Sequence, residues 1–418
     1  MPRPLGSQEH CFWLLGRSTS NHIVYAAEID GTAPPHAWRA AFDALQRRHP
    51  LLRVRIPATP NGYPYFDAGV DRPIPVHVTD DVPWHADGID AAWLDREIAR
   101  ELIEPIDHDR APLIRAIVAS EGNNGRRSLL IVAGSHTIFD GIGLAGCIRD
   151  VLRALAGVAL APLPVPPSLN QLLDVADAPP PTRPVSLDLP PSPDAGTPTV
   201  HRLRLSHTLT GALRLHARAA HTTVHGALCA AMLLTGRAHL SAWRRSAIKL
   251  VSPIDLRRQF GTEEDCAVYV TVGNALVEPD ARHGFWDMAR HILRTTNVPG
   301  SRASVRAETR DLSGQLRNGL DAAGVVRARR MGQARDLIVS NIGPLRYDTR
   351  VGPYEMTALW GPFVQTGDRG DHMLGVATVD GRLHLGLTSA TAEAAGWLEA
   401  VEVTLESALS PTGAMIEL

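Results

Sequence analysis

The sequence predicts an α+β protein built as two lobes, and three observations lead to that prediction. At 418 residues, the chain is too long for one ordinary hydrophobic core. A proline-dense tract at 161–199 separates an N-terminal part, 1–160, from a C-terminal part, 200–418. In the N-terminal part, hairpin-like strand pairs outnumber βαβ crossovers, which favours an α+β fold with antiparallel pairing. The tract itself is expected either to pack as a connector along a surface or to be a flexible linker.

The N-terminal part begins with an apolar, β-prone run that predicts a strand over 21–29. Pro35 suits a helix start, and Trp38 and Phe42 belong to one apolar face of a helix over 35–48. Pro50 ends that helix. Further elements are predicted as strands over 51–56, 112–119 and 129–133 and as helices over 91–102 and 142–152.

The C-terminal part repeats a rhythm of strands and helices, without a sequence repeat of fixed period. Ser206 and Thr208 are candidate caps for the first helix of this part, and Thr391 for the last. Strands are predicted over 200–205, 247–254, 267–272, 337–340, 356–360, 373–378 and 383–388. Helices are predicted over 209–220, 224–234, 286–294, 305–322 and 392–409.

One stretch organises the first half: Gly134-Ser135-His136-Thr137-Ile138-Phe139-Asp140-Gly141. His136 follows a buried strand, Asp140 comes four positions later, and Gly141 stands where a helix begins. This spacing places one imidazole at the mouth of a cleft, with a carboxylate near enough to hold the backbone around it. The adjacent Ser135 is not expected to form a dyad with His136, because neighbouring strand residues point to opposite faces.

The stretch resembles the His-His-x-x-x-Asp-Gly motif of the chloramphenicol acetyltransferase-like superfamily, with Ser135 in place of the first histidine. That superfamily includes condensation domains and polyketide-associated acyltransferases. Other segments resemble family elements in the same order: His49-Pro50-Leu51-Leu52-Arg53, Pro112-Leu113-Ile114-Arg115-Ala116, Thr223-Val224-His225-Gly226-Ala227-Leu228, Ser252-Pro253-Ile254-Asp255-Leu256-Arg257 and Val339-Ser340-Asn341-Ile342-Gly343. The resemblance implies two similar lobes that form a V with a tunnel between them.

The resemblance also implies roles for the residues of the motif. His136 would be the general base, a role that suits an imidazole with a pKa near working pH. Asp140 would pair with Arg257, or with Arg258 by a shift of one, and so fix the loop. Gly141 would let a pantetheine arm pass close to the backbone. Ser135 would support local structure.

Other candidates are less well defined by the sequence. A developing oxyanion needs a donor, and Ser340, Asn341 and Ser389 are all candidates. The cluster of Arg327, Arg329, Arg330 and Arg335 is either a docking site for a carrier protein or coenzyme A, or a solvated helix face. We expect no metal site, since neither His136 with Asp140 nor His221 with His225 has a visible third ligand.

Composition excludes several classes of function. A net charge of −2 gives no electrostatic case for nucleic acid. No run approaches the about 20 apolar residues of a membrane span, and the N-terminus lacks the apolar core of a signal peptide. Four scattered cysteines form no disulfide or zinc pattern. We therefore expect a cytoplasmic monomer.

The resemblance implies an acyltransferase of natural-product or lipid biosynthesis. It would move an acyl group from acyl-CoA, or from an acyl or peptidyl carrier protein, to the hydroxyl or amine of a small molecule, with no bound cofactor. The family element Asp-Phe-Gly-Trp-Gly is replaced by Leu359-Trp360-Gly361-Pro362, which favours a stand-alone tailoring enzyme. Two alternatives stay open: a non-catalytic protein that binds a carrier-tethered intermediate, and an enzyme that catalyses cyclisation or dehydration.

Overall fold

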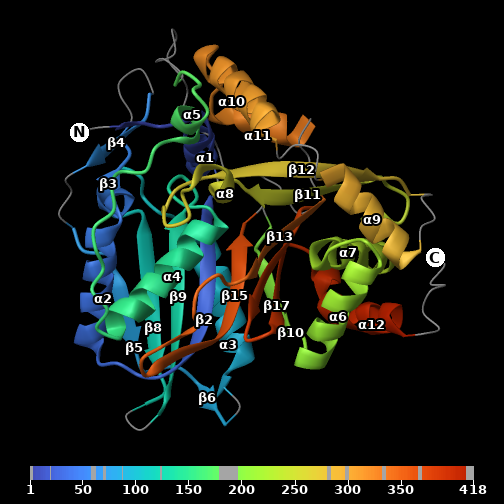
Figure 1. Cartoon of the computed structure of the whole chain (residues 1–418), viewed down its shortest axis with the longest axis horizontal. Helices are drawn as coiled ribbons and strands as arrows, with labels where there is room; N and C mark the ends of the chain where they lie inside the picture. Colours follow the sequence, from blue (N-terminus) through green and yellow to red (C-terminus); the bar gives the residue numbers. More distant parts are fainter. Residues whose placement is uncertain are drawn as a thin grey trace.

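The computed structural model describes residues 3–18, 20–57, 63–68, 72–86, 88–122, 125–177, 196–279, 284–296, 301–331, 336–365 and 370–410. Two six-stranded sheets dominate these residues (Figure 1). In spatial order, the first sheet contains β14 (Arg350–Val351), β15 (Tyr354–Val364), β2 (His22–Asp30), β9 (Arg127–Ser135), β8 (Ile114–Ser120) and β5 (Val76–Thr79). The second contains β10 (Thr199–Arg204), β17 (Arg382–Ser389), β16 (His372–Val379), β13 (Leu337–Pro344), β11 (Ile248–Asp255) and β12 (Val270–Val277).

Most neighbouring strands in both sheets run antiparallel, as the sequence predicts. The parallel pairs are β5 with β8, β11 with β13, and β13 with β16. Smaller sheets are formed by β1 (Arg3–Pro4), β4 (Tyr65–Ala68) and β3 (Val54–Arg55), and by β6 (Trp84–His85) and β7 (Gly88–Ile89). The α+β class and the two lobes are therefore confirmed.

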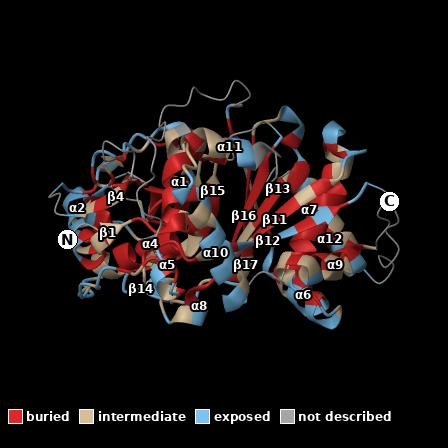
Figure 2. Cartoon of the chain, turned by 90° about the horizontal axis from the view of Figure 1, so that it is seen from above, coloured by how far each residue is buried: buried red, intermediate tan, exposed pale blue. Residues whose placement is uncertain are grey.

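Twelve α-helices lie in the described part of the chain. They are α1 (Ser7–Ser18), α2 (Pro35–Arg48), α3 (Ala91–Ile103), α4 (Gly141–Leu155), α5 (Leu169–Leu172), α6 (His207–Ala219), α7 (Val224–His239), α8 (Arg257–Phe260), α9 (Phe285–Thr296), α10 (Arg302–Arg317), α11 (Ala322–Met331) and α12 (Trp397–Leu409). In Figure 1, α2 and α4 lie with the first sheet, and α6, α7, α9 and α12 with the second. Figure 2 shows the buried residues gathered on the strands and inner helix faces of both lobes.

The C-terminal half contributes structure to the first lobe. Strand β15 pairs with β2 over Glu355–Asp30 to Val364–Ile23 and so extends the first sheet. Helices α10 and α11 contact α1. The two sheets meet where β15 contacts β16 and β17. Because of this exchange, the lobes are bound together by a shared strand as well as by a surface.

The described part of the proline-dense tract packs on the first lobe. Arg48 donates hydrogen bonds from Nη1 to the Ala161 carbonyl at 2.8 Å, and its own carbonyl accepts one from the Leu163 amide. Ser168 and Gln171 form a capping box that starts α5. Residues 161–177 thus lie along a surface, whereas 178–195 fall outside the described residues.

Several element predictions were wrong, each for a local reason. The strand predicted over 51–56 is a 3₁₀ helix, Pro50–Arg53, followed by β3. The helix predicted over 305–322 is divided into α10 and α11, and Gly319 between them has φ +88°. The last helix begins at Trp397 and not at 392, because Gly396 lies in the left-handed region at φ +77°.

Among the residues described, no helix combines the length and the apolar character that a bilayer crossing needs.

Candidate active site

The loop that carries His136 is shaped by residues on either side of it. Strand β9 ends at Ser135, and the amides of Ile138 and Phe139 both donate to the Ser135 carbonyl, which makes a tight turn. A side chain on Gly134 would come within 2.6 Å of the Phe139 ring, so only glycine leaves room for this turn. The His136 amide donates to the Asn21 carbonyl at 3.1 Å. The predicted sequence of strand, loop and helix is thereby confirmed.

The imidazole of His136 has a defined orientation and tautomer. Its Nδ1 lies 2.7 Å from the Phe139 carbonyl oxygen. A carbonyl can only accept, so Nδ1 carries the proton and Nε2 bears the lone pair of the neutral ring. The ring stacks on Phe12 of α1 with centroids 4.0 Å apart. A half-buried imidazole held in this way has the tautomer that a general base at Nε2 requires.

His136 opens onto a cavity of about 140 Å³ whose walls come from both lobes. Its lining is mostly apolar, and three wall residues, Val251, Ile338 and Met373, form a small buried cluster of their own. The other residues that line it are Phe12, Leu15, Asn21, Ile23, Asp140, Gly141, Pro253, Val270, Val272, Ser340, Pro362, Val364 and Gln365. The cavity therefore joins one imidazole to a largely apolar space between β11, β13 and β15.

Asp140 is buried and holds the loop to the C-terminal half. Its Oδ1 accepts from the Gly143 amide at 2.8 Å, which makes it the N-cap of α4. Its Oδ2 accepts from Arg257 Nη1 at 2.6 Å and from the Tyr269 amide at 2.9 Å. The structure thus pairs Asp140 with Arg257 and not with Arg258. Both carboxylate oxygens of Asp140 accept from structural donors, which fits a role in holding the loop.

Arg257 is almost fully buried and is held by several acceptors. Its guanidinium also donates to Asp255 Oδ1 at 3.2 Å and to the Ala267 carbonyl at 2.8 Å. Burial by itself would lower the pKa of Arg257, but the nearby carboxylates of Asp140 and Asp255 outweigh it and raise that pKa. The charge of Arg257 is consequently fixed at any working pH.

Gly141 lies at the first turn of α4 and lines the cavity. Its carbonyl accepts from the Tyr25 hydroxyl at 2.9 Å. A Cβ at this position would lie 3.2 Å from the Tyr25 hydroxyl and 3.4 Å from Pro362. The close approach of these groups explains glycine here, whatever substrate passes beside it.

Ser135 faces away from His136, as the strand geometry predicts. Its hydroxyl lies 2.9 Å from Nε2 of His108 and accepts from the Thr137 amide at 3.3 Å. Burial lowers the pKa of His108 to about 4, so this imidazole is neutral. Ser135 is fully buried and does not line the cavity of His136.

The structure separates the three candidate oxyanion donors. Ser340 on β13 lines the cavity with His136, and no described residue hydrogen bonds to its hydroxyl. Asn341 does not line the cavity, and its Oδ1 accepts from the Gly343 amide at 2.8 Å. Ser389 lies elsewhere, 2.9 Å from Nδ1 of His372 in the second lobe. Among the described residues, Ser340 is the candidate that geometry favours.

Arg327 of the basic cluster and the pair His221 and His225 do not line the cavity of His136. Arg327 is exposed on α11; the side chains of Arg329 and Arg330, and all of Arg335, lie outside the described residues. His225 is bonded through Nε2 to the Ser252 hydroxyl at 2.8 Å. No group of three or more potential metal ligands occurs in the described part of the chain.

Sequence reasoning missed helix α1, which supplies Phe12 and Leu15 to the cavity. A signal was present, because Glu9 stands three residues after Gly6. The Gly6 amide donates to Glu9 Oε2 at 2.7 Å, which is half of a capping box. Asn21, which also lines the cavity, has no sequence signature of its own.

Comparison with solved structures identifies the fold. Polyketide synthase associated protein 5 from Mycobacterium tuberculosis matches with a TM-score of 0.66 and 20% identity, over 98% of each chain. A trichothecene 15-O-acetyltransferase from Fusarium sporotrichioides matches with a TM-score of 0.68 and 11% identity, over 97% of this chain and 94% of that one. The first condensation domain of the calcium-dependent antibiotic synthetase gives 0.68 and 14%, over 99% and 98%. These likenesses show the fold: the chain is similar in fold to each of these three proteins over nearly its whole length.

Sequence comparisons match parts of the chain. Residues 194–347 match the profile of the phthiocerol/phthiodiolone dimycocerosyl transferase C-terminus. Chondramide synthase from Chondromyces crocatus is 26% identical over 172 residues, which are 39% of this chain and 4% of that protein. Tyrocidine synthase 3 from Brevibacillus parabrevis is 26% identical over 148 residues, 35% of this chain and 2% of that protein. The chain thus matches only a small part of these long synthases, and its fold is that of condensation domains and transferases of secondary metabolism.

Proposed function

We propose that this protein is an acyltransferase that moves an acyl group from a thioester to a hydroxyl or amine, with His136 as general base. The observation that carries the proposal is the orientation of His136, with Nδ1 fixed by the Phe139 carbonyl beside a cavity shared by both lobes. The donor would be acyl-CoA or an acyl or peptidyl carrier protein. The mainly apolar lining supports an acyl group or acceptor with aliphatic or aromatic surface.

In the proposed reaction, Nε2 of neutral His136 takes the proton from the acceptor hydroxyl or amine as that atom attacks the thioester carbonyl carbon. The carbonyl π electrons move to oxygen and give a tetrahedral oxyanion. When the carbonyl re-forms, the carbon–sulfur bond breaks and the thiolate leaves. The imidazolium returns the proton to sulfur, so the products are ester or amide and free thiol. No acyl-enzyme is needed.

The residues around His136 have distinct roles in this proposal. The Phe139 carbonyl stabilises the proton on Nδ1 in both charge states of the ring. Phe12 keeps the ring plane fixed by stacking. Ser340 would donate to the oxyanion from β13. Asp140 and Arg257 position the loop without touching substrate.

The proposal is tested by incubating the protein with acyl thioesters and candidate alcohols or amines and detecting products by mass spectrometry. His136→Ala should lower turnover by about a hundredfold or more and leave the fold unchanged by circular dichroism. Ser340→Ala should lower kcat by about a hundred- to a thousandfold. His36→Ala, at an exposed position of α2, is the matched control and should keep full activity.

Two outcomes would count against the proposal. A fully active His136→Ala enzyme would remove the imidazole from the mechanism. A wild-type protein that binds thioester-loaded carrier protein but forms no ester or amide would favour the non-catalytic alternative instead.

A further inference from the structure

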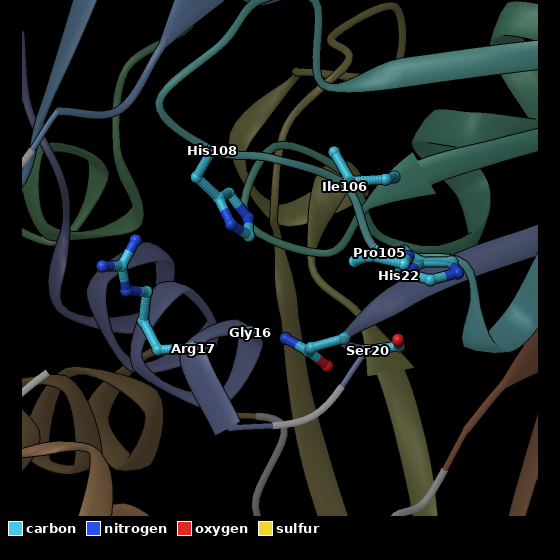
Figure 3. Close-up of a pocket in the computed structure, with 8 residues that line it drawn as sticks. Gly16, Arg17, Ser20, His22, Pro105, Ile106 and His108 are labelled. Carbon is cyan, nitrogen blue, oxygen red and sulfur yellow. The ribbon is translucent and has the colours of Figure 1, made fainter. Parts of the chain in front are cut away.

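A second cavity, of about 220 Å³, lies between the end of α1, the start of β2 and the loop before β8 (Figure 3). Its lining differs from that of the His136 cavity, because most of its side chains are polar. They are Arg17, Ser20, Asn21, His22 and His108, together with Gly16, Pro105 and Ile106. Figure 3 shows Arg17 and His108 on one side of the opening and His22 and Ser20 on the other.

Arg17 brings a weakly paired positive charge to this cavity. The nearest carboxylate oxygen, Asp109 Oδ2, is 3.7 Å from Arg17 Nη1, and the Asp109 side chain is 58% exposed. The buried arginine of the motif, by contrast, has a carboxylate at 2.6 Å. The Arg17 guanidinium also lies over the Trp13 ring, 5.5 Å from its centroid, which limits its movement. A loosely held guanidinium in a cavity is suited to a bidentate anion.

His108 adds a neutral hydrogen-bond donor. The buried Ser135 hydroxyl accepts from the Thr137 amide, so its own proton needs an acceptor. The Nε2 atom of His108, 2.9 Å away, provides it. In a neutral ring the remaining proton is then on Nδ1, and the ring that carries it lines the cavity.

The other polar groups of the cavity are already used as donors. Ser20 donates to the Ile103 carbonyl at 2.9 Å, and Asn21 Nδ2 donates to the Phe12 carbonyl at 2.9 Å. His22 Nε2 is 2.5 Å from the Glu101 carbonyl, so it too donates away from the cavity. Arg17 and His108 are therefore the pair of donors that a ligand can reach in the described lining.

This cavity adjoins the active site through the backbone. Asn21 lines both cavities, and its carbonyl accepts from the His136 amide. Ser135, which bonds to His108, directly precedes His136. A group bound at Arg17 would thus lie on the other side of the strand end that carries the catalytic imidazole.

We propose that this cavity is an anion-binding subsite, in which Arg17 and His108 hold a carboxylate or phosphate group. The binding of an anion is independent of the proposed acyl transfer; only its assignment to a substrate of that reaction rests on the proposed function. Two sources carry this chemistry: the phosphates of coenzyme A and a carboxylate on the acceptor.

Isothermal titration calorimetry on the full chain tests the subsite with three probes: coenzyme A, inorganic phosphate and succinate. Arg17→Gln should weaken binding of the probes that bind by about ten- to a hundredfold. Arg17→Lys should lose less, and Asp109→Asn should tighten binding, because it removes the competing carboxylate. Arg110→Gln is the charge-matched control. Arg110 is on the loop of His108 and Asp109, its side chain is 76% exposed, and it does not line the cavity.

The pattern of probes identifies the source. Binding of coenzyme A and phosphate that depends on Arg17 supports the subsite and assigns it to the coenzyme, whereas succinate binding that depends on Arg17 assigns it to the acceptor. The subsite is overturned if none of the probes binds the wild type, or if Arg17→Gln and Arg110→Gln bind them equally well. His136→Ala should keep anion binding unchanged, so a failure of acyl transfer leaves this result readable by itself.

Discussion

Helix α4 carries two buried carboxylates, Asp140 before its first turn and Asp150 in its third, and both are neutralised by arginine. Asp140 accepts from Arg257 and two backbone amides. Asp150 is fully buried and accepts from Arg48 Nε at 2.8 Å, Arg149 Nε at 2.9 Å and His49 Nε2 at 2.9 Å. The two sites use the same physics, about 15 Å apart along the helix.

Both clusters also bind the C-terminal half to α4. Arg257 reaches Asp140 from the segment between β11 and β12. Glu264 in the same segment accepts from Arg48 at 2.7 Å and from Arg149 at 3.0 Å. They differ in what they hold, because only Asp140 adjoins the loop of His136. A buried arginine–carboxylate pair is thus a structural device, and its effect on function depends on its neighbours.

The largest expected effect is on stability. Asp140→Ala leaves Arg257 buried with one weaker carboxylate partner, and we expect a loss of about 3–5 kcal/mol in the free energy of unfolding. Asp150→Ala should cost less, because Arg48 and Arg149 keep Glu264, which is partly exposed. Urea unfolding followed by circular dichroism measures both.

Activity separates the two sites more sharply. Per folded molecule, Asp140→Asn should lose most turnover, since the loop of His136 loses its anchor, whereas Asp150→Asn should keep it. Equal losses of turnover in Asp140→Asn and Asp150→Asn would show that proximity of the carboxylate to the His136 loop does not matter.

Acid should destabilise the protein in two steps. Burial lowers the pKa of His10, His22, His108 and His225 to about 4. A histidine with a lowered pKa binds fewer protons in the native state than in the unfolded state. Its contribution to the free energy of unfolding is therefore complete above about pH 6.5 and is lost as the pH falls towards 4.

Asp150 acts at lower pH. Burial alone would raise its pKa, but hydrogen bonds from His49 and Arg149 outweigh burial and lower it to about 2. Its contribution is complete above about pH 3.9 and is lost as the pH falls towards 2.

The histidine step is measured by urea unfolding at pH 7.5, 5.5 and 4.5. The urea midpoint should fall steadily over these values, and a flat profile would contradict the lowered pKa values of the buried histidines. His108→Gln should reduce the slope.

The smallest effects concern three glycines of α4. A Cβ on Gly146 would meet nothing within 4 Å, so Gly146→Ala should stabilise the helix by up to about 1 kcal/mol. A Cβ on Gly143 would lie 3.1 Å from Arg257 Nη2, so Gly143→Ala should lower the thermal midpoint. Gly141→Ala should raise KM as well, because Gly141 lines the cavity. If the thermal midpoint rose in all three variants, the Arg257–Asp140 pair would not limit the size of side chains on this helix.

Much of this region could be predicted from the sequence. The helix over 35–48 has the predicted bounds, since Pro35 starts it and its apolar face repeats at helical spacing. The motif places His136, Asp140 and Gly141 within six residues, so a short-range pattern was sufficient to identify these residues as site candidates. Arg257 was predicted through the resemblance, and the pair is present at 2.6 Å.

Other parts of the site could not be predicted in that way. Asp150 carries no motif, and its partner Arg48 is 102 residues away in sequence. Glu264, which also accepts from Arg48, is 216 residues from that arginine. Ser389 ends β17 and Ser340 lies within β13, and the two strands direct these hydroxyls to different surroundings. Strand β15 of the C-terminal half joins the first sheet by pairing with β2, and amino-acid composition does not reveal that pairing.

The strand, turn and helix around His136 follow from local sequence, because glycine conformation, capping by Asp140 and alternation along a strand act between residues a few positions apart. The walls of the His136 cavity, the position of Ser340 in its lining and the second, polar cavity arise from tertiary contacts. They depend on which strands pair and which helices pack, and those contacts join residues more than a hundred positions apart whose local patterns carry no record of one another.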